Sequence, residues 1–120
     1  MYKIVIYHDE NGNSEFEDYY LELNKKSLTS KDARIQYNII SRYIKYLERY
    51  GTRELPKDYA KQITGDIWEL RPDRHRILYF YYKDDTYVLL HHFIKRTRKT
   101  PKKEIIKAIK ERDDYVRRNK

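Results

Sequence analysis

Residues 67–101 read IWELRPDRHRILYFYYKDDTYVLLHHFIKRTRKTP, and this stretch decides the fold. Its β-branched and aromatic runs over 67–71, 75–82 and 86–94 are typical of strands. Two short polar sequences, PDR and KDD, separate these runs and are typical of tight turns. The stretch therefore predicts three antiparallel strands in a meander.

The last of these strands is apolar on both of its faces. Val88, Leu90 and Ile94 alternate with Leu89 and Phe93, so neither face is polar. A strand of this kind is covered on both sides. We therefore expect it to lie in the middle of the sheet.

Upstream of residue 67 the sequence predicts one more strand and a helical hairpin. Residues 2–7 are short and β-branched. Ser14 opens a Ser-x-x-Glu capping box, and apolar residues then recur at helical spacing up to Gly51. A break near residues 25–29 divides this region into two helices, and the segment after residue 51 is expected to be a connection.

Thr100 and Pro101 form a good N-cap and first-turn pair for a last helix that runs to about Val116. The expected order is strand, two helices, three strands and helix. This order is α+β: a small antiparallel sheet with helices packed on it. A chain of 120 residues is the size of one domain, so we expect residues 1–120 to form one.

Composition narrows the class of protein. The chain has no cysteine, and no apolar segment is long enough for a signal peptide or a membrane span, so a cytoplasmic protein is expected. The charge is uneven: residues 1–70 carry 11 basic and 12 acidic side chains, whereas residues 71–120 carry 16 and 7. The basic half favours an anionic partner, nucleic acid first.

Strand alternation sorts the cations near the first turn. Trp68 and Leu70 share one face, which we expect to be core, while Glu69 and Arg71 share the other. Arg76 begins the next strand just across the turn. The two arginines are therefore expected to approach one anion from adjacent strands, since guanidinium groups bind phosphate oxygens in pairs.

Further cations follow the last strand. Lys95 and Arg96 are expected to complete the cluster with Glu69, Arg71 and Arg76. Five more basic side chains surround it and are candidates for RNA contacts: Arg74, Arg98, Lys99, Lys102 and Lys103. Two alternatives stay open: the arginines pair only with neighbouring acids, or the basic loop is a solvated face or docks an acidic partner.

No cofactor and no metal is expected, because the chain has no phosphate-binding glycine loop and no metal-ligand spacing. A site of arginine and lysine suits cleavage of RNA, which carries its own nucleophile, the 2′-hydroxyl. Glu69 and Lys95 are the candidate bases. His91 and His92 lie on opposite faces of one strand and are weaker candidates.

These residues resemble the RelE/ParE superfamily of toxins, and most closely its phage-derived HigB-like branch. The resemblance rests on residues 63–115. Its motifs are WELR at 68–71, RILY at 76–79 and FIKRT at 93–97, followed by Thr100-Pro101. Residues 1–60 match only in outline.

The resemblance implies a toxin of a type II toxin–antitoxin pair, with a RelE-like fold. HigB-like toxins are ribosome-dependent mRNA endoribonucleases that cleave the message on the small subunit. The implied partners are a HigA-like antitoxin with a helix-turn-helix, the ribosome and its message, and operator DNA reached through the antitoxin. Arg76 matches the phosphate-binding arginine of the family, and Arg71, Lys95 and Arg96 match basic positions.

The chain departs from the RelE pattern at two places. A lysine is usual where Glu69 stands, and a tyrosine is common near Pro101, where this chain has none. Two other functions stay open: a ParE-like toxin that binds DNA gyrase, and a basic nucleic-acid-binding module without catalysis. Convergent cations argue against the gyrase ligand.

Overall fold

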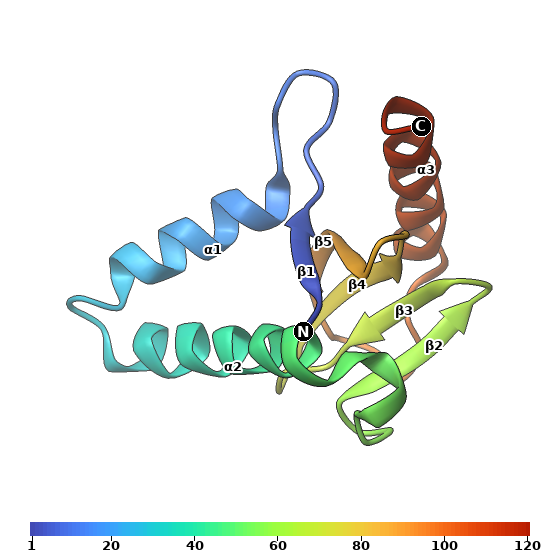
Figure 1. Cartoon of the computed structure of the whole chain (residues 1–120). Helices are drawn as coiled ribbons and strands as arrows, with labels where there is room; N and C mark the ends of the chain where they lie inside the picture. The colour runs from blue at the N-terminus through green and yellow to red at the C-terminus, as the bar shows by residue number, and fades with distance from the viewer.

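The structure is a computed structural model that describes all 120 residues. The chain forms a five-stranded mixed sheet with three helices, so the predicted α+β class is confirmed (Figure 1). In chain order the elements are β1 (Lys3–Ile6), α1 (Glu15–Lys26), α2 (Lys31–Glu54), β2 (Ala60–Thr64), β3 (Ile67–Leu70), β4 (His75–Tyr81), β5 (Thr86–Ile94) and α3 (Lys102–Arg118). The order within the sheet is β1-β5-β4-β3-β2, and the architecture is compatible with a RelE-like fold.

The sheet has a hydrophobic core on each face. The hairpin of α1 and α2 packs on one face, where Phe16, Ile40 and Leu47 meet Tyr79 and Leu89. Helix α3 covers the other face. Figure 1 shows the hairpin and α3 on opposite sides of the strands. Strand β5 lies between β1 and β4, as its two apolar faces predict.

The sheet is not wholly antiparallel, because β1 pairs with β5 in parallel. The meander of β3, β4 and β5 is antiparallel as predicted, since its turns are short. The chain leaves β1 through two helices instead. A connection of that length leaves the direction of β1 free, so turn chemistry cannot specify it.

Strand β2 was expected to be a connection and is a strand at the edge of the sheet. It pairs antiparallel with β3 through the turn at Gly65, whose φ is +51°. Most of its side chains are exposed, so it has no apolar alternation from which a strand is predicted.

A β-bulge in β5 changes which side chains share a face. His91 pairs with Leu78 while Leu89 pairs with Tyr79, so Leu90 is the extra residue. Beyond the bulge, Phe93 packs in the core on the α3 face with Leu90. The expected grouping of Phe93 with Leu89 is therefore wrong, because simple alternation does not allow for an inserted residue.

The starts of the first two helices follow the predicted caps, whereas the end of α2 and the start of α3 do not. Ser14 and Ser30 accept backbone N–H bonds at the starts of α1 and α2. Gly51, with φ +72°, interrupts α2, and a last turn continues to Glu54. At α3 the cap position is Pro101, and the Thr100 side chain makes no capping bond.

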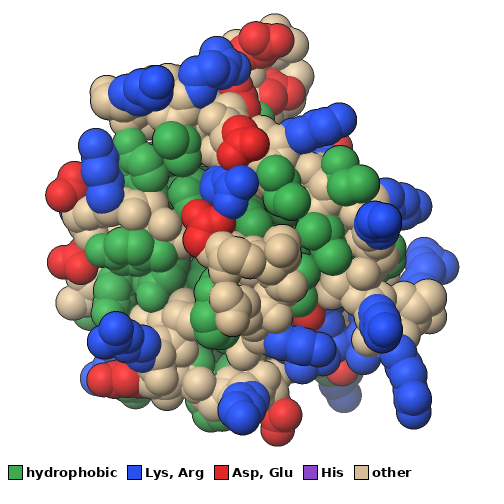
Figure 2. Space-filling view, turned by 90° about the vertical axis from the view of Figure 1, so that its right-hand side faces the viewer, with side chains coloured by type: hydrophobic (Ala, Val, Ile, Leu, Met, Phe, Trp, Pro, Cys, Tyr) green, Lys and Arg blue, Asp and Glu red, His purple; other side chains and the backbone are tan.

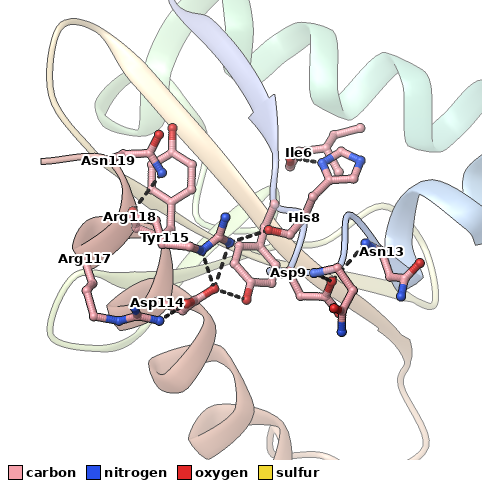
Figure 3. Close-up of polar contacts among 11 residues, drawn as sticks. Ile6, His8, Asp9, Asn13, Asp114, Tyr115, Arg117, Arg118 and Asn119 are labelled. Carbon is pink, nitrogen blue, oxygen red and sulfur yellow. Dashed lines mark hydrogen bonds and ion pairs between the residues drawn. The ribbon is translucent and has the colours of Figure 1, made fainter.

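The C-terminal end of α3 is tied to the end of β1. The Tyr7 hydroxyl donates to Asp114 Oδ2 at 2.6 Å, and the Arg118 guanidinium donates to Asp114 and to the His8 carbonyl. Figure 3 shows the Asp114 carboxylate facing Arg118 beside the segment that carries His8. No helix of the structure is both long enough and apolar enough to traverse a bilayer.

Candidate active site

A small polar hollow, with a cavity volume of about 20 Å³, opens where β3 and β5 end and β4 begins, beside the loop that leads into α3. Only one of its ten lining residues is hydrophobic. The lining residues are Lys61, Glu69, Arg71, Arg76, Phe93, Lys95, Thr97, Arg98, Lys99 and Thr100. We call it the cationic hollow.

Strand register brings its side chains together. Glu69 pairs with Leu78 and Arg76 with Phe93, so their side chains lie on the α3 face of the sheet. The bulge in β5 puts Phe93 on this face, and Lys95 follows two residues later. The backbone N–H of Lys95 donates to the Arg74 carbonyl at 2.8 Å, which ties the loop to the β3–β4 turn.

Glu69 lies at the floor of the cationic hollow and is only 3% exposed. Its Oε2 lies 3.5 Å from Arg71 Nε and 3.8 Å from Arg76 Nε. Its Oε1 accepts a 2.6 Å hydrogen bond from the Thr100 hydroxyl. One buried carboxylate therefore holds two arginines and the end of the basic loop, and this bond explains why Thr100 does not cap α3.

Arg76 is fixed by the backbone as well. Its Nη1 donates to the carbonyls of Asp73 and His75, at 2.6 and 2.7 Å. Asp73 has φ +55°, a left-handed conformation that turns the chain back toward the arginine. Burial lowers the pKa of Arg76, and Glu69 opposes that shift. An arginine in this setting is a rigid cation at the floor of the hollow.

The cations toward solvent are more open. The Arg71 side chain is 24% exposed, and its Nε is buried without a hydrogen bond. Lys95, Arg98 and Lys99 are exposed at the rim. Figure 2 shows Lys and Arg side chains crowded along one edge of the molecule with few acidic groups between them. This edge attracts anions.

The structure brings together six of the ten residues expected to form the site: Glu69, Arg71, Arg76, Lys95, Arg98 and Lys99. Arg96 and Lys103 line a separate hollow beside Glu104. Arg74 and Lys102 are exposed and line neither. Lys95 and Arg96 follow the end of β5 and line different hollows, which share Phe93 and Thr97.

Lys61 is a site residue that sequence reasoning missed. It is exposed on β2 and pairs across the sheet with Glu69. Because β2 was expected to be a connection, nothing in the sequence linked Lys61 to the arginines. Once β2 is known to pair with β3, the register is the signal that finds it.

The histidines lie outside the cationic hollow. His91 is 1% exposed and sits between two carboxylates of α3, with Nδ1 2.5 Å from Glu111 and Nε2 3.1 Å from Glu104. His92 lies on the opposite face of the sheet and stacks on Tyr19. Neither histidine lines the cationic hollow.

His75 and His92 form a buried pair beneath the helical hairpin. His75 Nδ1 lies 2.9 Å from His92 Nε2, and His75 Nε2 lies 2.7 Å from Gln36 Oε1. Burial lowers the pKa of His75 to about 4 and that of His92 to about 3. Both rings are therefore neutral at pH 7, with His75 donating to Gln36 and His92 donating to His75.

The geometry defines the chemistry of the hollow. Three arginine and three lysine side chains line the small hollow, and this arrangement suits the oxygens of a phosphate. Rigid cations stabilise the negative charge that develops when a phosphodiester is attacked. Nowhere in the structure do three or more histidine or carboxylate side chains converge as ligands for a metal ion.

A small α+β protein with a mixed five-stranded sheet and a cationic hollow fits the class of RelE-like toxins. The family model described as Phage derived protein Gp49-like (DUF891) matches residues 26–113, more than two thirds of the chain. The chain therefore belongs to the Gp49-like family, a RelE/HigB-type toxin family of toxin–antitoxin systems, and the family implies an antitoxin partner. A comparison with curated protein sequences found no similar sequence.

Proposed function

We propose that this protein is the toxin of a type II toxin–antitoxin pair and a ribosome-dependent mRNA endoribonuclease. The observation that carries the proposal is the cationic hollow, where Arg71, Arg76 and Lys95 converge over the buried carboxylate of Glu69. Membership of the Gp49-like family supports the toxin class. A HigA-like antitoxin is the proposed partner, and residues 1–120 are the proposed toxin domain.

The proposed reaction uses the 2′-hydroxyl of the message. Its oxygen bonds to the adjacent phosphorus, and the bond from phosphorus to the 5′-oxygen breaks. The products are a 2′,3′-cyclic phosphate and a 5′-hydroxyl. The 2′-hydroxyl gives its proton to a base, and the leaving oxygen receives one from an acid. Arg71 and Arg76 stabilise the crowded phosphorus centre.

The contacts of each residue support different roles within this reaction. Both oxygens of Glu69 face other side chains, so we assign it the positioning of Arg71 and Arg76. Lys95 is exposed at the rim and is free to contact the message or exchange a proton with it. The ribosome would then complete the orientation of the RNA, since the hollow alone offers few proton-transfer groups.

The test is primer extension on a defined message, with purified protein, with and without translating ribosomes. We expect cuts only when ribosomes translate the message. Cuts on naked RNA would contradict ribosome dependence. No cuts in either reaction would contradict the endoribonuclease and redirect the assignment to gyrase binding.

A further inference from the structure

A second hollow lies beside Trp68, on the other side of the β2 edge from the cationic hollow. Its cavity volume is about 460 Å³, within the range of pockets that hold small molecules. Its lining residues are Lys57, Asp58, Ala60, Lys61, Gln62, Trp68 and Arg71. We call it the Trp68 hollow.

The two hollows share Lys61 and Arg71, which line both. Glu69 faces α3, and its neighbour Trp68 packs against the core on the hairpin face. Because β2 is the edge strand, no further strand separates the two faces on its outer side. An extended polyanion can therefore pass from one hollow to the other around this edge.

Trp68 is half-buried: part of its side chain packs against the core on the hairpin face, and part lines the Trp68 hollow. It is the only tryptophan, and none of the aromatic pairs of the chain includes it. Its indole N–H has no acceptor in the chain and is not buried, so it is free to donate to a ligand. A partly exposed aromatic ring beside cations is typical of platforms that stack a nucleobase.

We propose that the Trp68 hollow binds a nucleobase of the RNA strand whose phosphate lies in the cationic hollow. The base stacks on Trp68, and Lys61 and Arg71 contact the backbone between base and reacting phosphate. Lys57 at the mouth adds attraction for the strand. This inference rests on the proposed function and gives it a site for a base next to the cleaved bond.

The test uses the single tryptophan as the reporter. The intact protein is titrated at low salt with a short single-stranded RNA that is 2′-O-methylated throughout and so cannot be cleaved by its own hydroxyl. Inorganic tripolyphosphate is the matched probe, because it binds cations and has no base to stack. We expect saturable quenching of Trp68 fluorescence by the RNA and little by tripolyphosphate.

Substitutions separate stacking from charge. Trp68→Phe keeps an aromatic face and should bind labelled RNA nearly as well as the wild type, whereas Trp68→Leu should bind it roughly 5- to 100-fold more weakly. Lys57→Glu, on the exposed mouth, should weaken binding several-fold, and Lys110→Glu on α3 is its charge-matched control. If Trp68→Leu does not fold, the inference is still tested by the quenching of the wild type. It is tested as well by the comparison of Lys57→Glu with Lys110→Glu.

Two results would overturn the inference. The first is that the RNA binds but quenches Trp68 fluorescence no more than tripolyphosphate does. The second is that the RNA does not bind at low salt. Neither result touches the proposed function, which is read from cleavage of ribosome-bound message by the same preparation. Loss of cleavage with quenching intact would instead leave a base-binding site on a protein that is not a nuclease.

Discussion

Glu69 joins the parts of the cationic hollow that come from different elements. Its carboxylate faces Arg71 and Arg76 and accepts from Thr100, so it connects β3, β4 and the loop before α3. A buried carboxylate between cations stabilises the fold only while its partners stay charged and close. The same contacts fix where the arginines point, which is the requirement of a site that stabilises a transition state.

Glu69→Gln tests this role. The amide keeps an acceptor for Thr100 and removes the charge that faces two arginines, so we expect a loss of about 2–3 kcal/mol in the free energy of unfolding. Chemical denaturation measures it, with the exposed Glu54→Gln as the matched control. A loss below about 0.5 kcal/mol, the range of ordinary surface changes, would show that Glu69 does not hold the arginines.

At the scale of elements, the central strands were predictable and the edges were not. The meander followed from its turns and its apolar runs, and β5 has the predicted bounds, 86–94. Strand β2 was missed because it is short and exposed at the edge. The bulge at Leu90 was missed because it is a property of pairing between two strands, which one sequence does not display.

These misses limited what could be predicted of the site. Strand alternation was enough to put Glu69, Arg71 and Arg76 on one face. Lys61 could not be found without β2, and Arg96 was grouped with Lys95 although it lines a separate hollow. Local sequence preference predicts that Thr100 caps α3. Its hydroxyl instead donates to Glu69, which is 31 residues away in the sequence.

The buried pair of His75 and His92 makes the contact between hairpin and sheet sensitive to acid. Arg74, Arg76, Asp73 and Asp32 are the charged groups around His75, but burial is the main cause of its low pKa. Both folded-state pKa values lie below 6.5, so between pH 6.5 and pH 4 the unfolded chain binds more protons. Stability therefore falls as the pH falls through this window, by on the order of a few kcal/mol for the pair.

Denaturation at pH 6.5 and pH 5 measures this dependence, and His92→Phe should reduce it while keeping the ring that packs on Tyr19. His8→Gln is the control. The hydrogen bond that the His8 ring donates to the Glu17 carboxylate raises the pKa of His8, so its contribution to stability is present below pH 6.5 and lost as the pH rises. An unchanged slope in His92→Phe would contradict the account of the pair.

Helix α3 depends on Asp114 at its C-terminal end. Hydrogen bonds from Arg118 and Tyr7 lower the pKa of Asp114 to about 2 from 3.8. A depressed carboxylate stabilises the fold above pH 3.8, and this stabilisation is lost as the pH falls toward 2. Asp114→Asn should make amide exchange in the last turns of α3 roughly tenfold faster at pH 7.

The neighbouring Asp113→Asn is the matched control, because Asp113 is exposed and pairs only with Arg112. It should leave exchange in the last turns of α3 unchanged. Equal exchange rates in the two variants would mean that the contacts in Figure 3 do not anchor the helix.

At the scale of the whole molecule, the excess positive charge and the cationic hollow lie at the same edge. The net charge of +8 comes from residues 71–120, which build β4, β5, the basic loop and α3. The cationic hollow opens on this edge, and the Trp68 hollow adjoins it through Lys61 and Arg71. An anionic strand that approaches this edge meets fixed cations first and the indole platform beside them.

The most direct measurement is the rate at which ribosome-bound message is cleaved by the wild type, by Lys95→Ala and by Lys110→Ala. Both variants lose one exposed lysine, and only Lys95 lines the hollow. We predict that Lys95→Ala cleaves roughly 10- to 100-fold more slowly, as expected when one charged hydrogen bond is lost, with unchanged thermal unfolding. Lys110→Ala should match the wild type. Equal cleavage by all three proteins would contradict the claim that the cationic hollow is where the message is cut.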